Sequence, residues 1–140
     1  MQLKIKKIHP EAKLPIYAHP YDAGMDLFAL EETKLKPSEI TKVRTGIAAE
    51  IPEGYVGLCW DKSGLATKYG ITVLAGVIDS GYRGEILIAV VNLSKEEYIF
   101  EKGHKVTQML IQPVQSMEII ESEELSDTSR GEGGFGSTGK

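Results

Sequence analysis

Two runs of β-branched and aliphatic residues, separated by one short turn, limit what this chain can fold into. The first run, "ITVLAGVI", covers residues 71–78, and the second, "EILIAVVNL", covers residues 85–93. The residues between them, "DSGYRG" at 79–84, are typical of a tight turn. Apolar runs of this length bounded by turn residues predict strands that are buried on both faces. We therefore expect a β-hairpin formed by two buried strands.

Most of the remaining chain also has the pattern of short strands separated by turn residues. Residues 61–70, "DKSGLATKYG", are the exception, because Ser63 as N-cap and Gly70 as C-terminal stop predict one or two helical turns. Residues 9–24 contain three prolines and end in glycine, which predicts a loop. Together these features predict an all-β sandwich, barrel or jelly roll with one short helix. The other expected strands are residues 3–8, 25–30, 39–51, 54–60, 97–100, 105–114 and 117–121.

The composition restricts the functions open to the chain. Its 140 residues are expected to form one domain. The net charge is −4 and no block of basic residues is present, so a nucleic-acid partner is not expected. No run reaches the roughly 20 apolar residues of a membrane span, and we expect a cytoplasmic protein without a membrane partner. The single cysteine, Cys59, excludes an internal disulfide and is expected to be a buried apolar residue.

The last eleven residues, "RGEGGFGSTGK" at 130–140, contain five glycines and one aromatic residue. Residues 134–140 match part of a phosphate-binding P-loop, but the serine or threonine and the helix that should follow are missing, so a true P-loop is not expected. Glycines still allow backbone N–H groups to converge on an anion, and Arg130 can hold phosphate oxygens through two N–H groups. Phe135 offers a flat face to a base. The alternative is a flexible terminus without a ligand.

Four further segments carry polar residues at positions suited to a nucleotide. Asp26 stands alone among apolar neighbours, and residues 62–64 place a cation, a hydroxyl and a glycine at an expected helix start, where anions bind. Asp79 and Tyr82 lie on the turn between the two apolar runs, and Gln108 lies in an expected strand, where it needs a partner. Each segment has a purely structural alternative: a turn before a strand, an N-cap, an Asp-Ser-Gly turn and a structural glutamine.

Taken in order, these four segments and the tail resemble the five motifs of the trimeric dUTPases. The most specific are "GVIDSGYRG" at 76–84 and "RGEGGFGSTG" at 130–139, and the resemblance covers nearly the whole chain. It implies a jelly-roll or distorted β-barrel domain over residues 1–125 and a flexible glycine-rich C-terminal arm over residues 126–140. The family forms a homotrimer in which all three subunits contribute to each active site, and the arm closes over a neighbour's site.

The resemblance also implies hydrolysis of dUTP to dUMP and pyrophosphate, with Mg²⁺ on the triphosphate. Such a dUTP diphosphatase limits uracil incorporation into DNA and supplies dUMP for dTMP synthesis. Asp79 is then the general base, or orients the water that attacks the α-phosphorus, while Asp26 holds a metal-bound water. Tyr82 packs against the deoxyribose and excludes UTP. The other implied contacts are Lys62, Ser63, Gly64 and Gln108 for phosphates, Gly76, Val77, Ile78 and Leu87 for the uracil edge, Phe135 for stacking, and Arg130, Gly136, Ser137 and Thr138 from the arm.

Four positions depart from the family pattern. The family usually has arginine where this chain has Lys62 and Lys105, and lysine keeps the charge but lacks the planar fork that matches a phosphate. Thr107 replaces a usual alanine, and Glu132 adds a negative charge to the arm. We expect these changes to weaken nucleotide binding without abolishing activity.

Two rival functions share the resemblance in the core. A dCTP deaminase, alone or bifunctional, has arginine and two serines where this chain has "KSGLA" at 62–66. A binding or structural jelly-roll protein without enzymatic activity is expected to have lost Asp79, Tyr82 or the arm, and all three are present here.

Overall fold

The structure, a computed structural model, describes residues 2–134, which form mostly β-sheet with one short helix. In this part of the chain, no helix has the length and apolarity needed to span a membrane. The helix is α1 (Ser63–Tyr69), and the strands are β1 (Lys4–Lys7), β2 (Met25–Phe28), β3 (Thr33–Leu35), β4 (Ile40–Arg44), β5 (Ile47–Glu50), β6 (Tyr55–Trp60), β7 (Ile71–Leu74), β8 (Val77–Ile78), β9 (Leu87–Asn92), β10 (Tyr98–Phe100) and β11 (Lys105–Pro113).

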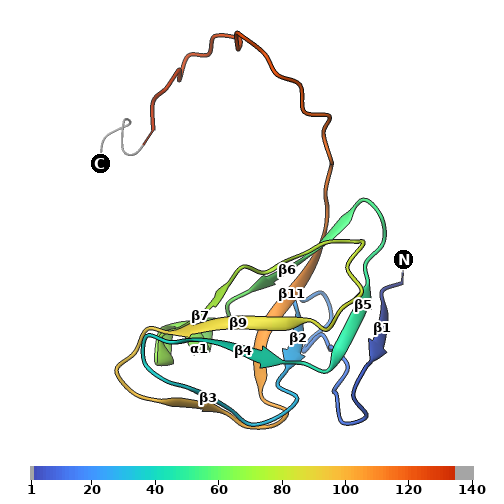
Figure 1. The fold of residues 1–140 in the computed structure, drawn as a ribbon, viewed down its shortest axis with the longest axis vertical. Helices are drawn as coiled ribbons and strands as arrows, with labels where there is room; N and C mark the ends of the chain where they lie inside the picture. The colour runs from blue at the N-terminus through green and yellow to red at the C-terminus, as the bar shows by residue number, and fades with distance from the viewer. Residues whose placement is uncertain (1, 135–140) are drawn as a thin grey trace.

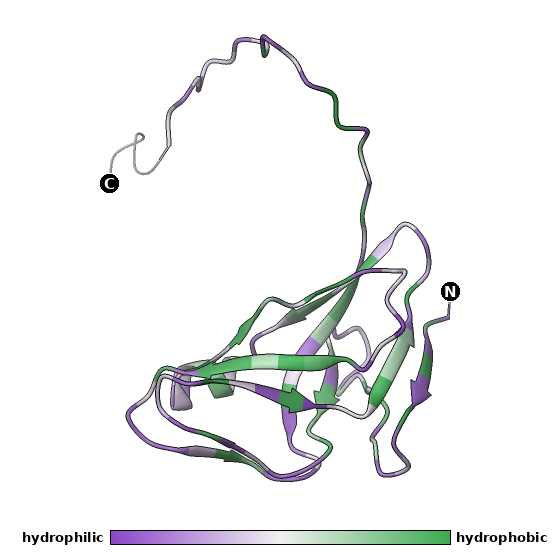
Figure 2. Ribbon diagram, viewed as in Figure 1, coloured by the Kyte–Doolittle hydropathy of each residue, from purple (hydrophilic) through white to green (hydrophobic). Residues whose placement is uncertain are grey.

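Antiparallel sheets surround one apolar core (Figure 1). One sheet has the strand order β2-β11-β6-β8, another has the order β4-β9-β7, and β1-β5 and β3-β10 form two-stranded pairs. Strand β9 is apolar along most of its length (Figure 2). Because β11 pairs with both β2 and β6, it brings the N-terminal third of the chain beside its middle. The largest fully buried side chains include Leu27, Leu35, Ile47, Ile71, Ile86, Ile88, Phe100 and Met109.

The expected hairpin between residues 71–78 and 85–93 is only partly right. Strand β7 does pair antiparallel with β9, but the first run breaks at Ala75 and Gly76, whose φ angles are 61° and 105°. Beyond the break, β8 joins the other sheet by pairing with β6. A Cβ at Gly76 would lie 2.8 Å from the carbonyl oxygen of Cys59, so only glycine fits this close approach. The segment after the break therefore crosses from one sheet to the other and does not form a simple turn.

The two strands are also not buried on both faces as predicted. Along β9, buried residues alternate with more exposed ones, which is the pattern of an antiparallel strand with one face on the core. The helix begins one residue earlier than predicted, because the N-cap is Lys62 and Ser63 is the first helical residue. The stop at Gly70 is confirmed: it adopts the left-handed conformation and its N–H closes the last turn.

Three further strand predictions differ from the structure. Residues 39–51 divide into β4 and β5, because Gly46 takes a φ of 69° between them. Strand β3 had no clear signal in the sequence, and its residues are held by pairing with β10. Residues 117–121 form no strand, and Met117, Ile119 and Ile120 are largely exposed to solvent.

After β11 the chain leaves the body of the molecule (Figure 1). The N–H of Val114 donates to the carbonyl of Gly54 at 2.8 Å, and from there to residue 134 the chain contains no helix or strand. This segment keeps large apolar side chains in solvent, including Leu125, which is 89% exposed.

Candidate active site

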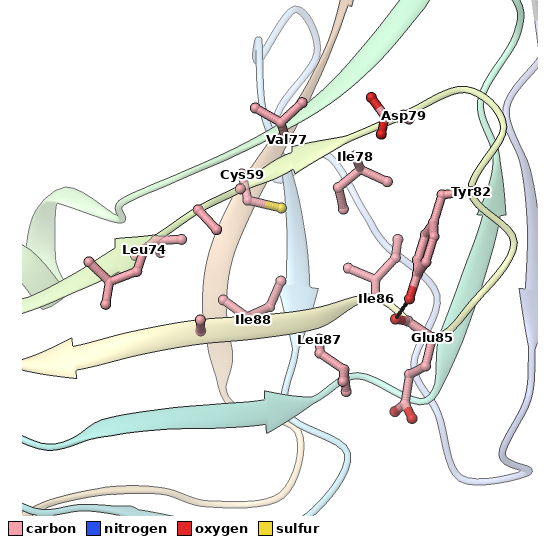
Figure 3. Close-up of a pocket in the computed structure, with 14 residues that line it drawn as sticks. Cys59, Leu74, Val77, Ile78, Asp79, Tyr82, Glu85, Ile86, Leu87 and Ile88 are labelled. Atoms are coloured by element: carbon pink, nitrogen blue, oxygen red, sulfur yellow. Dashed lines mark hydrogen bonds between the residues drawn. The ribbon is translucent and has the colours of Figure 1, made fainter.

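The crossover between the two sheets forms one wall of a pocket of about 210 Å³ (Figure 3). Its floor is apolar, with Ile78, Ile86 and Ile88 pointing into it, while Asp79 and Tyr82 stand at its edge. The predicted uracil-edge residues Gly76, Val77, Ile78 and Leu87 all line this pocket, together with Asp79 and Tyr82. An apolar pocket with a few polar groups at its edge suits a small planar ligand.

Tyr82 is fixed at both its backbone and its hydroxyl. Its N–H donates to the carbonyl of Asp79 at 3.0 Å, and its hydroxyl donates to the carbonyl of Glu85 at 2.9 Å. The ring lies so close to Gly84 that a Cβ there would be 2.4 Å from the tyrosine oxygen. The glycine after the tyrosine and arginine is therefore required for this ring position.

A second cluster joins Asp26 to Lys62 and Lys105. The Nζ of Lys62 lies 2.5 Å from Oδ1 of Asp26, and the Nζ of Lys105 lies 2.6 Å from Oδ2. The Asp26 side chain is only 5% exposed. Burial raises the pKa of Asp26, but the hydrogen bonds and charges of Lys105 and Lys62 outweigh burial, so the pKa of this carboxyl lies below its ordinary value. With two ammonium groups on one carboxylate, the three side chains of this cluster carry a net positive charge.

Gln108 in β11 is paired with Asp26 in β2. Its side-chain amide has the hydrogen-bond partner that the sequence analysis expected. Its Nε2 donates to the backbone carbonyl of Asp61 at 2.9 Å. The carboxylate of Asp61 in turn accepts from the N–H of Val73 at 2.6 Å and from the hydroxyl of Thr72 at 2.8 Å. Asp61 thus ties the segment before α1 to both β11 and β7.

The phosphate-binding residues predicted at the start of α1, Ser63 and Gly64, are exposed to solvent. Arg130 lies in the C-terminal segment, where its Nε donates to the carbonyl of Gly133 at 2.8 Å. In Figure 1 this segment leads away from the body of its own chain. The remaining predicted arm contacts, Phe135, Gly136, Ser137 and Thr138, lie outside the described residues.

Residues 2–134 contain no group of three His, Cys, Asp or Glu side chains placed to hold a metal ion directly. Both oxygens of Asp26 are already engaged by ammonium groups. This donor set fits a Mg²⁺ that is carried by a triphosphate and touches the protein through water, since Mg²⁺ keeps several of its waters in such sites.

The dUTPase family model matches residues 10–139, which is most of the chain. The chain belongs to the dUTPase family. A deoxyuridine 5'-triphosphate nucleotidohydrolase of Clostridium kluyveri is 50% identical to it over 141 residues, covering 99% of each chain. Among solved structures, a dUTPase of Staphylococcus bacteriophage 80alpha with dUpNHpp superposes with a TM-score of 0.93 at 33% identity, covering 99% of each chain. A dUTPase of phage phi11 of S. aureus, with a TM-score of 0.83 and 29% identity, covers 89% of this chain and 98% of its own and is described with a structural Mg(II) ion.

The dUTPase motifs predicted from the sequence account for the two clusters, but not for the residues that hold them in place. Asp61 and Glu85 were missed, although each lies directly beside a motif residue. An acidic residue just before Lys62, in a segment expected to bind anions, was a signal that could have drawn attention to Asp61. Glu85 had no comparable signal, because its partners lie about 40 residues earlier in the chain.

Proposed function

We propose that this chain hydrolyses dUTP to dUMP and pyrophosphate by attack of water on the α-phosphorus. Family membership and the full-length relative at 50% identity support dUTP nucleotidohydrolase activity. The observation that carries the proposal is the apolar pocket with Asp79 and Tyr82 at its edge (Figure 3). In the cell the reaction would limit uracil incorporation into DNA and supply dUMP for dTMP synthesis, and we place it in the cytoplasm.

The pocket is proposed to bind the nucleoside. The backbone of Gly76, Val77 and Ile78 and the residues near Leu87 read the uracil edge, and a thymine 5-methyl group would clash with this segment. Tyr82 packs on the deoxyribose where a 2′-hydroxyl would stand. The hydrogen bond from its hydroxyl to the Glu85 carbonyl holds the ring in one position. A fixed ring supports the exclusion of a 2′-hydroxyl by direct contact.

Asp79 is proposed as the catalytic carboxylate that accepts a proton from the attacking water or orients it. Its side chain is exposed at the edge of the pocket. With the base in the pocket, the sugar and the α-phosphate of a nucleotide would extend past this edge. No covalent intermediate with the protein is needed, so the protein contributes through positioning and electrostatic stabilisation.

The phosphates are proposed to lie across the start of α1, at Lys62, Ser63 and Gly64, with Gln108 directed at the α-phosphate or its water. A Mg²⁺ ion bound to the triphosphate would supply charge neutralisation there. Each oxygen of Asp26 accepts from one lysine and keeps a second lone pair, so Asp26 could also hold a metal-bound water. The contacts of Lys62 and Lys105 with Asp26 place both cations at one spot, which supports a role of this cluster in binding phosphate oxygens.

The active protein is proposed to be a homotrimer built from jelly-roll domains of residues 1–125, with residues 126–140 as an arm that closes over a neighbour's site. The arm would bring Arg130, Ser137 and Thr138 to the γ-phosphate, with Gly136 beside them, and Phe135 onto the uracil. The apolar side chains of Met117, Ile119, Ile120 and Leu125, which stand in solvent in one chain, support burial against other subunits.

The proposal is tested by measuring pyrophosphate release with Mg²⁺ from dUTP, dTTP, dCTP and UTP in parallel. We expect release from dUTP alone, and its loss in Asp79→Asn, which keeps the shape of the side chain but removes the base. Ammonia or dUMP formed from dCTP would place the chain among the deaminases, and no turnover of any of the four would reject the enzymatic function.

A further inference from the structure

The carboxylate of Glu85 ties the exit of the pocket loop to the corner between β4 and β5. Its Oε1 accepts from the N–H of Gly46 at 2.9 Å, and its Oε2 accepts from Nη2 of Arg44 at 3.2 Å. The Glu85 side chain is only 16% exposed, whereas the Arg44 side chain is 44% exposed. A largely buried carboxylate with charged and backbone donors is held more firmly than a surface ion pair.

Two further hydrogen bonds anchor the next residue to the same corner. The hydroxyl of Thr45 donates to the carbonyl of Ile86 at 2.6 Å, and the N–H of Ile86 donates to the carbonyl of Ile47 at 2.9 Å. The corner has little freedom of its own, since Gly46 has a φ of 69° and a Cβ there would lie 2.9 Å from the Cβ of Ala12. The backbone of Glu85 and Ile86 is therefore fixed to the body of the protein.

The fixed backbone of Glu85 is also the acceptor for Tyr82. The tyrosine hydroxyl donates to the Glu85 carbonyl at 2.9 Å, the bond drawn as a dashed line in Figure 3. Tyr82 is 46% exposed, so packing alone does not fix its ring. The direction of the ring depends on an acceptor that is held by the carboxylate of the same residue on one side and by the hydrogen bonds of Ile86 on the other.

We propose that Glu85 is a positioning residue for Tyr82 and thereby sets the discrimination between deoxyribose and ribose nucleotides. The inference deepens the proposed function and rests on it. With the acceptor held from both sides, the ring occupies the space of a 2′-hydroxyl. Without the carboxylate the acceptor is held only through Ile86, so the ring can move aside more easily and a ribonucleotide can enter. Glu85 itself need not touch the substrate.

The test is the ratio of kcat/KM for dUTP to kcat/KM for UTP, measured in the full chain and in Glu85→Gln and Glu85→Ala. Both substrates are read from the same preparation, so a smaller folded fraction cancels in the ratio. We expect Glu85→Ala to lower the ratio about tenfold, the upper range of what one hydrogen bond contributes. Glu85→Gln keeps an acceptor for Gly46 but loses the charge facing Arg44, and a smaller fall is expected. The matched control is Glu31→Gln, since Glu31 lies 3.9 Å from the other side of the Arg44 guanidinium.

A second measurement separates positioning of the tyrosine from a general loss of order. In a Tyr82→Phe background the hydroxyl is absent, and Glu85→Ala should then change the ratio no further. An unchanged ratio in Glu85→Ala, or a full additional fall in the double variant, overturns the inference. Failure of the unmodified protein to hydrolyse dUTP would overturn the proposed function instead, so the two failures are distinguishable.

Discussion

The contact of Asp26 with Lys62 and Lys105 predicts a pH-dependent loss of stability when this carboxylate is removed. In Asp26→Asn, one carboxylate oxygen is replaced by an N–H₂ group. The remaining oxygen can accept from only one of Lys62 and Lys105, and the N–H₂ group faces the other lysine. A hydrogen bond to a charged group contributes about 1.5–3 kcal/mol, and both lysines remain in partial contact with water. We therefore expect Asp26→Asn to lower the free energy of unfolding by about 2 kcal/mol at pH 7.

The sign of the pH dependence follows from the direction of the pKa shift. Because the pKa of Asp26 is lower in the folded chain than its ordinary value, its stabilisation is fully present above an unfolded-state pKa of about 3.9. It is lost as the pH falls through the lower folded value. The asparagine variant cannot titrate at this position, so the difference in stability between the two proteins should shrink in acid.

The assay is urea unfolding at one fixed protein concentration, repeated from pH 7 downward to the lowest pH at which the unmodified protein still folds. Glu50→Gln is the control, because Glu50 pairs with Lys4 at 2.8 Å on the surface and no measurable change is expected. A difference between Asp26→Asn and the unmodified protein that stays constant across this range would refute the electrostatic account. Equal stability at pH 7 would refute it as well.

Three other predictions follow from single contacts. Gly84→Ala places a Cβ 2.4 Å from the hydroxyl oxygen of Tyr82, so the ring must move. We expect kcat/KM for dUTP to fall at least tenfold, and unchanged kinetics would contradict the ring position. Burial raises the pKa of the Cys59 thiol to about 11, so labelling by a thiol reagent at pH 8 should be slow in the folded protein and fast in urea; rapid labelling of the folded protein would contradict this burial. Asp61→Ala leaves the N–H of Val73 without its acceptor, and thermal unfolding should report a loss of about 1–3 kcal/mol, whereas an unchanged melting temperature would show that this contact is dispensable.

Local patterns in the sequence were enough for several parts of this protein. Alternation and turn residues identified most of the strands, and the stop at Gly70 was found because a left-handed helix end favours glycine wherever it occurs. The pocket residues from Gly76 to Tyr82 are consecutive or nearly so, and for that reason a short motif could collect them. The same holds for the order of the five motifs, which pointed to the family before any contact was known.

Other features depended on contacts between distant parts of the chain. The run at 71–78 looks continuous, but it divides between two sheets because Gly76 must pass close to the backbone of Cys59. The resemblance implies that Lys62 and Lys105 face phosphate, and the folded chain brings both to Asp26, Lys62 from the N-cap of α1 and Lys105 from the start of β11. Glu85 meets Arg44 and Gly46 only after β9 and the corner before β5 are assembled. Local propensity therefore determined where most strands and turns lie. The tertiary structure decided which charged side chains meet, because partners some 40 residues apart leave no local pattern in the sequence.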